Sequence, residues 1–228
     1  MNLIKPTANF LQGITLKAFA NCHIEGQNNV PAFGPLIIVA NHQSNFDPAL
    51  LSATIPRHTL FLAKKDIFSN PISSWLLRLY GAYPLDRSGA SIGAYRWALT
   101  QLYKGQPIVI FPEGTRNPKG MGKAKLGVSQ IALKSQSTLL PVGITGTERF
   151  NSWTRVFNPT GEIRVRIGPA FYMPSIDGNP NKKVLESLTD IIMNRIAILL
   201  PREYQGVYGI ETFDSQQHSE VPNKTLGK

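Results

Sequence analysis

Cysteine is almost missing from the sequence: Cys22 is the one cysteine among 228 residues. One thiol cannot form an intramolecular disulfide, and it excludes a zinc site built on several cysteine ligands. The four histidines are scattered without the spacing of metal ligands, so we expect no metal site. A chain of this length buries a core large enough to fold without such cross-links.

Long apolar runs are missing as well. The run LIIVA at 36–40 is among the longest, far short of the ~20 residues that cross a bilayer. The N-terminus has no basic segment followed by an apolar stretch and a cleavage site. We therefore expect neither an integral membrane protein nor a secreted one. Apolar residues make up 42% and charged residues 17% of the chain, which excludes an intrinsically disordered protein.

Acidic residues are few, with 14 Asp and Glu against 24 Lys and Arg and a formal net charge of +10. The excess is concentrated in residues 61–128, where ten bases face only Asp66, Asp86 and Glu113. Such a region predicts an anionic partner: nucleic acid, an anionic membrane or a phosphorylated substrate. Nucleic acid is disfavoured, because the bases form no dense run and no aromatic RNA-binding segment accompanies them.

Apolar runs alternate with amphipathic segments along the chain. We expect strands at 36–40, 58–63, 106–112, 138–144 and 162–171, and helices at 49–55, 73–81, 91–105, 125–136 and 184–200. This alternation predicts an α/β fold, a single domain with a mixed, mostly parallel sheet flanked by helices.

The two ends of the chain differ from this pattern. An amphipathic stripe at 7–20 predicts a helix that packs on the core or, alternatively, lies on a membrane surface. We therefore expect an N-terminal amphipathic helical segment over 1–22 with possible membrane contact. The globular domain is expected over 23–211, and the polar stretch 212–228 predicts a flexible tail.

A polar cluster, NHQSNFD at 41–47, directly follows the first expected strand. Ligand sites of α/β sheets form at such strand ends. Asp47 can reach back to hold one ring nitrogen of His42, which leaves the other nitrogen to take a proton. The pair could then act as a general base on a hydroxyl without a serine nucleophile. The same spacing also occurs in purely structural turns.

A second cluster, FPEGTRN at 111–117, follows the expected strand 106–112. Gly114 allows close backbone approach, Arg116 offers a bidentate fork for phosphate, and Glu113 could orient Arg116 or contact the substrate. The alternative is a turn with a surface ion pair. Further candidate anion contacts in the basic region are Lys64, Lys65 and Arg87.

These clusters resemble the motifs of the glycerolipid acyltransferases of the 1-acylglycerol-3-phosphate acyltransferase (PlsC-like) family. The family's first motif, Asn-His, four residues, Asp, stands here as Asn41, His42 and Asp47, and its third motif as FPEGTR at 111–116. The segment GAYPLDR lies between them and LLPVGI follows. The resemblance covers about 23–145 and extends less distinctly to about 200. The second motif departs from the family, which usually has an apolar residue and Ile or Val before the arginine that stands here at Arg87.

The resemblance implies transfer of a fatty acyl group from a thioester to the free hydroxyl of 1-acylglycerol 3-phosphate (lysophosphatidic acid), giving phosphatidic acid. His42 would be the general base and Asp47 its partner. The residues implied to bind substrate are Arg87, Glu113, Gly114, Thr115, Arg116, Lys64 and Lys65. No cofactor is implied beyond acyl-CoA or acyl carrier protein as co-substrate, and no metal. A lipid substrate also implies a peripheral protein on the cytoplasmic face of the cell membrane, at an anionic surface.

Other interpretations of the same residues remain open. The acceptor could be glycerol 3-phosphate or another lysophospholipid. A non-catalytic module that binds anionic lipid would not need both His42 and Asp47. A serine hydrolase is disfavoured, because the chain has no G-x-S-x-G segment.

Overall fold

The computed structural model describes residues 20–209, apart from residues 80, 86–89, 151–160 and 177. Residues 7–19 of the helix expected at 7–20, and the tail expected after 211, lie outside these residues, and both stay predictions. The first strand begins at Ala20. Residues 20–22 therefore belong to the sheet and not to the expected N-terminal helical segment.

Seven strands form one mixed sheet in the order β1-β7-β6-β2-β5-β3-β4. Strands β2 to β6 run parallel to one another, β7 runs antiparallel to β6, and β1 pairs in parallel with β7. The expected α/β fold with a mostly parallel sheet is thus confirmed. The strands are β1 (Ala20–Glu25), β2 (Leu36–Ala40), β3 (Leu60–Lys64), β4 (Ala82–Leu85), β5 (Pro107–Ile110), β6 (Thr138–Thr145) and β7 (Gly161–Ile167).

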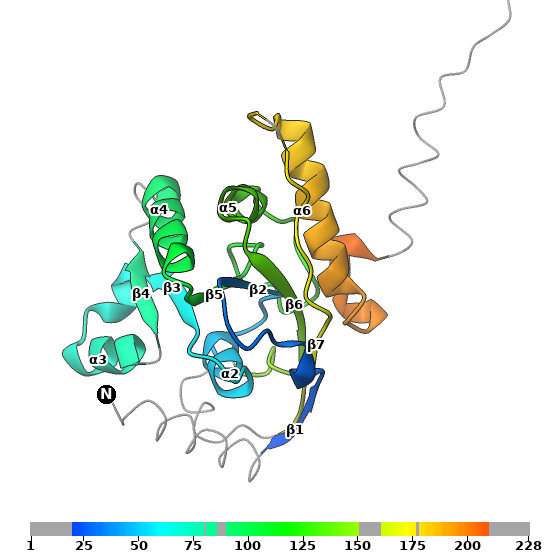
Figure 1. Cartoon of the computed structure of the whole chain (residues 1–228). Helices are drawn as coiled ribbons and strands as arrows, with labels where there is room; N and C mark the ends of the chain where they lie inside the picture. Colours follow the sequence, from blue (N-terminus) through cyan, green and yellow to red (C-terminus); the bar gives the residue numbers. More distant parts are fainter. Residues whose placement is uncertain (1–19, 80, 86–89, 151–160, 177, 210–228) are drawn as a thin grey trace, which may run out of the picture.

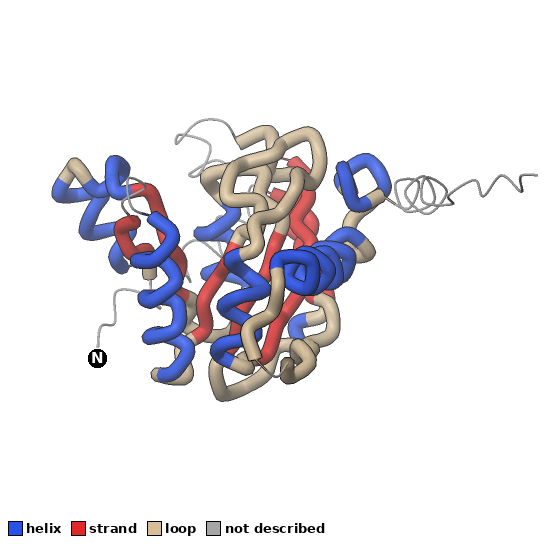
Figure 2. The backbone as a smooth tube through the Cα atoms, turned by 90° about the horizontal axis from the view of Figure 1, so that it is seen from above, coloured by secondary structure: helices blue, strands red, loops and turns tan. Residues whose placement is uncertain are grey.

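Helices cover both faces of the sheet (Figures 1 and 2). One face carries α4 (Ala90–Tyr103), α5 (Gly127–Ser135) and α6 (Lys182–Ala197), and the other carries α2 (Asp47–Thr54) and α3 (Pro71–Leu79). Short 3₁₀ helices are η1 (Gln27–Asn29), η2 (Lys65–Phe68), η5 (Arg202–Tyr204) and η6 (Gly206–Tyr208).

The central strand β2 explains why the core has two halves. All five of its side chains are fully buried. Leu36, Ile38 and Ala40 pack with α2 and α3, whereas Ile37 and Val39 pack with α4, α5 and α6. A strand buried on both faces needs a continuous apolar run rather than an alternating one, and LIIVA supplies it.

Two strands were not expected from the sequence, β1 and β4. Both lie at the ends of the strand order, so each pairs along one side only. Edge strands keep exposed side chains, such as Ile24 on β1 and Tyr83 on β4, and therefore lack the apolar run of a central strand. Pro84 also makes this segment resemble a turn in the sequence, although proline is tolerated in an edge strand such as β4.

The parallel strands bring several loops to one edge of the sheet. Strands β2, β3, β5 and β6 all end at this edge, because they run in the same direction. The segments that follow β2 and β5 are the two polar clusters at 41–47 and 111–117. The fold therefore places both clusters at the strand ends where ligand sites form in α/β sheets.

Candidate functional site

The loop after β2 is fixed to the neighbouring strand before it reaches the histidine. The side chain of Asn41 is buried and bonds the backbone of Ile144 in β6 twice. Its amide donates to the Ile144 carbonyl, and its oxygen accepts the Ile144 N–H, each over 2.8 Å. These two hydrogen bonds to β6 fix the backbone of Asn41, the residue directly before His42.

His42 and Asp47 form the expected pair. Nδ1 of His42 lies 2.8 Å from Oδ2 of Asp47, the first residue of α2. Asp47 is fully buried. Its Oδ2 also accepts the backbone N–H groups of Gln43 at 2.7 Å and Ser44 at 2.8 Å, while Oδ1 accepts the hydroxyl of Thr147 at 2.6 Å. These donors replace the water that burial removes, so the carboxylate can stay buried.

The ring of His42 is held in one orientation. Its face stacks on Phe111, with ring centroids 4.1 Å apart and planes at 22°. Because Asp47 occupies Nδ1, Nε2 is the ring nitrogen available to a substrate proton. The side chain is 16% exposed, so a ligand can reach it. The arrangement is that of a general base held by a buried carboxylate.

Glu113 is buried and ties the two loops together. Its carboxylate accepts the backbone N–H of His42 at 3.0 Å and of Gly122 at 2.7 Å, and it also accepts the side-chain amide of Asn117. The backbone N–H of Asn117 in turn donates to the carbonyl of His42 over 2.6 Å. Burial raises the pKa of Glu113, while these donors act in the opposite direction. That Glu113 also contacts the substrate stays a prediction.

Three other expected residues lie on the exposed loop after β5: Gly114, Thr115 and Arg116. Gly114 adopts φ +68°, and a Cβ at this position would lie 2.9 Å from the side chain of Lys125. Glycine is therefore favoured by the left-handed backbone conformation, whereas the lysine side chain could move aside for a larger residue. Thr115 and Arg116 are exposed and open to a ligand.

The remaining expected residues are Lys64, Lys65 and Arg87. Lys64 ends β3, and Lys65 begins η2 with an exposed side chain. Strand β3 is the neighbour of β5, so both lysines lie along the same edge as the polar clusters. Arg87 lies outside the described residues. Its role and the substrate contacts of the lysines stay predictions.

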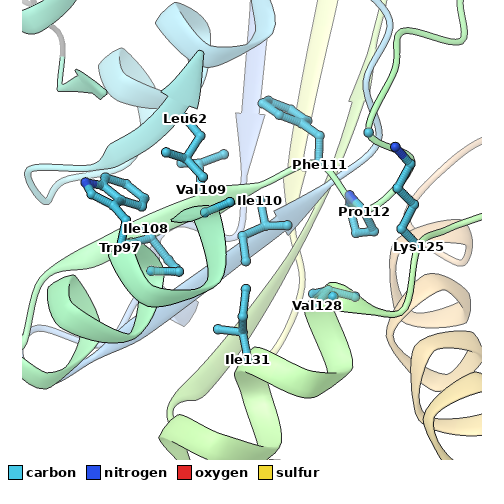
Figure 3. A pocket seen from close by; sticks show the side chains of 14 residues that line it. Leu62, Trp97, Ile108, Val109, Ile110, Phe111, Pro112, Lys125, Val128 and Ile131 are labelled. Atoms are coloured by element: carbon cyan, nitrogen blue, oxygen red, sulfur yellow. The ribbon is translucent and has the colours of Figure 1, made fainter. Parts of the chain in front are cut away.

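An apolar cavity of about 170 Å³ lies between β5, α4 and α5 (Figure 3). Side chains from β3, α4, β5 and α5 line it, including Leu62, Trp97, Ile108, Ile110, Val128 and Ile131. Phe111, Pro112, Gly114 and Lys125 line it where β5 ends. Phe111 is thus shared by the two features, because it lines the cavity and its ring stacks on His42.

The cavity and the contacts of three polar residues of this region were not expected from the sequence: Asn117, Lys125 and Thr147. The cavity draws its lining from four separate elements, and no local pattern links them. Thr147 lies 100 positions from Asp47 in the chain. The available signal for Thr147 was its position just after an expected strand, at the edge where sites form.

Comparison with known proteins agrees with this geometry. The family model described as Acyltransferase matches residues 21–145, a segment that includes both polar clusters. The 1-acyl-sn-glycerol-3-phosphate acyltransferase of Streptococcus pneumoniae is 30% identical over 179 residues, which is 77% of this chain and 63% of the relative. The enzyme of that name from Bacillus subtilis is 26% identical over 196 residues, or 85% of this chain and 95% of the relative.

The chain spans less than two thirds of the length of the first of these relatives. It is also 31% identical over 144 residues to the chloroplast enzyme LPAT1 of Arabidopsis thaliana. That match covers 61% of this chain and 40% of LPAT1. A solved structure shares its fold: the crystal structure of the 1-acyl-sn-glycerophosphate (LPA) acyltransferase PlsC from Thermotoga maritima, with a TM-score of 0.66 and 22% identity. That match covers 97% of this chain and 82% of PlsC. Because the family model covers more than half of the sequence, this chain belongs to the Acyltransferase family.

Proposed function

We propose that the chain transfers a fatty acyl group from a thioester to the free hydroxyl of lysophosphatidic acid and so forms phosphatidic acid. The observation that carries this proposal is the His42–Asp47 pair, with Nδ1 bonded over 2.8 Å and the ring stacked on the wall of an apolar cavity. Relatives in the same family bear the name 1-acyl-sn-glycerol-3-phosphate acyltransferase.

The proposed chemistry needs one base and no covalent intermediate. Nε2 of His42 removes the proton of the acceptor hydroxyl while the hydroxyl oxygen attacks the thioester carbonyl carbon. The carbon–sulfur bond then breaks, and the leaving thiolate takes the proton back from Nε2. Asp47 stabilises the imidazolium that exists between the two steps. The acceptor supplies the attacking oxygen, so the protein needs no serine or cysteine nucleophile.

The acyl chain and the acceptor phosphate require different surroundings in the site. We place the acyl chain in the cavity that Phe111 lines, because the lining side chains are almost wholly apolar. The acceptor phosphate requires cations, and the candidate is Arg116, which is exposed on the loop after β5 whose Glu113 and Asn117 bond the backbone of His42. Holding the phosphate there would position the hydroxyl at His42, a proximity effect that can lower the barrier by about 7 kcal/mol or more.

The donor in this proposal is an acyl thioester, either acyl-CoA or acyl carrier protein, and no cofactor takes part. The chemistry supports this choice, because the acceptor hydroxyl, a bound thioester and a general base are all that the proposed transfer needs. Lys64, Lys65 and Arg87 are the candidate contacts for donor phosphates or for anionic lipid.

The site of action in this proposal is the cytoplasmic surface of the cell membrane, where the lipid acceptor lies. Among the helices of the described residues, none is long and apolar enough to cross a bilayer. A net charge of +10 favours an anionic surface. Helix α3 also exposes large apolar side chains, with Ile72 72% and Trp75 54% exposed, next to the cation Arg78.

The test is an acyl-transfer assay on purified protein. Acyl-CoA and acyl carrier protein thioesters are each offered with lysophosphatidic acid, glycerol 3-phosphate or another lysophospholipid, and the lipid products are separated by chromatography. We expect phosphatidic acid from lysophosphatidic acid, and none from His42→Ala. His23→Ala is the matched control, because His23 is exposed on the edge strand β1.

The other outcomes separate the alternatives. Product only from glycerol 3-phosphate or from another lysophospholipid would change the acceptor and keep the reaction. No product from any acceptor, with vesicle binding intact, would replace the enzyme by a lipid-binding module. Full activity of His42→Ala would overturn the general-base assignment.

A further inference from the structure

Thr147 contacts the catalytic pair although no motif includes it. It follows β6, two residues beyond the segment that the family model matches. The residue is fully buried. Its hydroxyl oxygen lies 2.6 Å from Oδ1 of Asp47 and 3.3 Å from Oε1 of Gln43. A hydroxyl carries one proton and cannot donate to both oxygens, and the shorter contact identifies Asp47 as the acceptor.

Gln43 supplies an independent observation. Its side chain is buried, and its amide nitrogen Nε2 has no hydrogen-bond partner among the described residues. A buried donor without a partner is costly. The oxygen and nitrogen of a glutamine amide exchange places when the amide turns by 180°. After that turn Nε2 donates to the hydroxyl oxygen of Thr147, and the hydroxyl keeps its proton for Asp47.

We propose that Gln43 and Thr147 are positioning residues that complete a buried chain of hydrogen bonds, from the Gln43 amide to the Thr147 hydroxyl, to the Asp47 carboxylate and to the His42 ring. Their role rests on the acyl transfer proposed above. The backbone N–H groups of Gln43 and Ser44 and the His42 ring hold Oδ2 of Asp47, and Oδ1 needs a partner of its own for the carboxylate to be held at both oxygens. Thr147 holds Oδ1, which keeps Oδ2 aimed at Nδ1 of His42.

The first test replaces the hydroxyl and nothing else. Thr147→Val keeps the branched shape and removes the donor, and Thr147→Ser keeps the donor. We expect Thr147→Val to lower kcat by about tenfold to a hundredfold and to leave KM unchanged for both substrates. The variant misplaces the base, whereas it does not alter the groups that bind the substrates. Thr147→Ser should restore most of kcat.

A second readout does not need activity. The proton on Nδ1 of His42 lies in the hydrogen bond to Asp47 and gives a low-field nuclear magnetic resonance signal, identified by its loss in His42→Ala. Thr147→Val should shift or broaden that signal, and Thr147→Ser should not. The matched control is Thr189→Val on α6, which removes a buried hydroxyl bonded to Ser129 and to the carbonyl of Leu185. It should change neither kcat nor the signal.

These outcomes keep the two proposals apart. A Thr147→Val protein with the wild-type kcat and an unchanged signal would overturn the positioning role. If the wild type transferred no acyl group, the proposed function would fail, and the signal would still decide whether Thr147 positions the pair. Should Thr147→Val not fold, Gln43→Met supplies the same readouts, with a drop in kcat of about threefold to tenfold expected. No change in Gln43→Met would then contradict the chain.

Discussion

The backbone of His42 is held from both sides by the loop that follows β5. Its N–H donates to Glu113, and its carbonyl accepts from Asn117. At the scale of single residues, the third motif therefore positions His42, the proposed base, in addition to the substrate contacts proposed for it. This explains why a glutamate is buried beside a cationic loop: its charge serves the backbone of the histidine.

Glu113→Gln tests this role. The carboxylate of Glu113 accepts hydrogen bonds from N–H groups, whereas the NH2 group of glutamine would face one of these donors and accept nothing. We therefore expect the free energy of unfolding at neutral pH to fall by about 1–3 kcal/mol and kcat to fall as well. Urea denaturation and steady-state kinetics measure the two effects. Glu203→Gln, at an exposed carboxyl in η5, is the control and should change neither quantity.

The pH dependence of the same variant follows from the raised pKa of Glu113. The folded state binds this proton more tightly than the unfolded chain does. The resulting stability is fully present below the ordinary value of 4.5 and is lost as the pH rises through the raised pKa of the folded state. Glutamine has no proton to gain, so the stability of the wild type relative to Glu113→Gln should increase as the pH falls. A constant difference across that range would contradict the assignment.

At the scale of elements, what the sequence predicted depended on how local the signal was. The buried strand β2 appears as one apolar run, and its predicted and observed bounds are the same. His42 and Asp47 lie five positions apart, so their contact could be foreseen from spacing. The contact of Asp47 with Thr147 joins two loops that only the sheet brings together, and no local pattern announces it. The edge strand β4 was missed because it pairs along one side only and exposes Tyr83, so it lacks the apolar run of a central strand.

The cavity between α4, α5 and β5 gives an element-scale prediction. Ala94 on α4 lines it, so Ala94→Phe should fill part of it. We expect kcat/KM to fall by about fourfold for each methylene group that no longer fits, with short acyl chains unaffected. Assays with acyl-CoA thioesters from butyryl to palmitoyl measure this. Gly93→Phe is the control, because no described atom lies within 4 Å of an added Cβ there. Equal losses for all chain lengths would exclude the cavity as the acyl site.

Helix α3 gives a second prediction at this scale. Its buried side packs through Leu77 on the core, while Ile72 remains 72% exposed. If this surface meets lipid, Ile72→Ser should weaken binding to phospholipid vesicles by about tenfold, because an isoleucine loses apolar contact. Ile198→Ser is the matched control, since Ile198 is 73% exposed beyond the end of α6. Co-sedimentation measures both variants, and equal binding of the two would remove α3 from the membrane contact.

At the scale of the whole molecule, the fold separates three requirements of the proposed reaction. The sheet edge holds the base and its buried partners, the α4–α5 face holds the apolar cavity, and the chain as a whole carries the positive charge. A lipid substrate is partly apolar and partly anionic, so a protein that acts on it must offer both kinds of surface near one base. Here the cavity and the base share Phe111, which joins two of the three requirements in one side chain.

The net charge of +10 gives a prediction for the molecule as a whole. Electrostatic attraction to anionic lipid is screened by salt, whereas apolar contact is not. Raising the NaCl concentration from about 0.05 to 0.5 M should therefore weaken binding to anionic vesicles by about tenfold or more and leave the weaker binding to neutral vesicles unchanged. Ile72→Ser should lower binding to both vesicle types at every salt concentration, because its contribution is apolar. Anionic binding that resists salt would show that the charge does not bring this protein to a membrane.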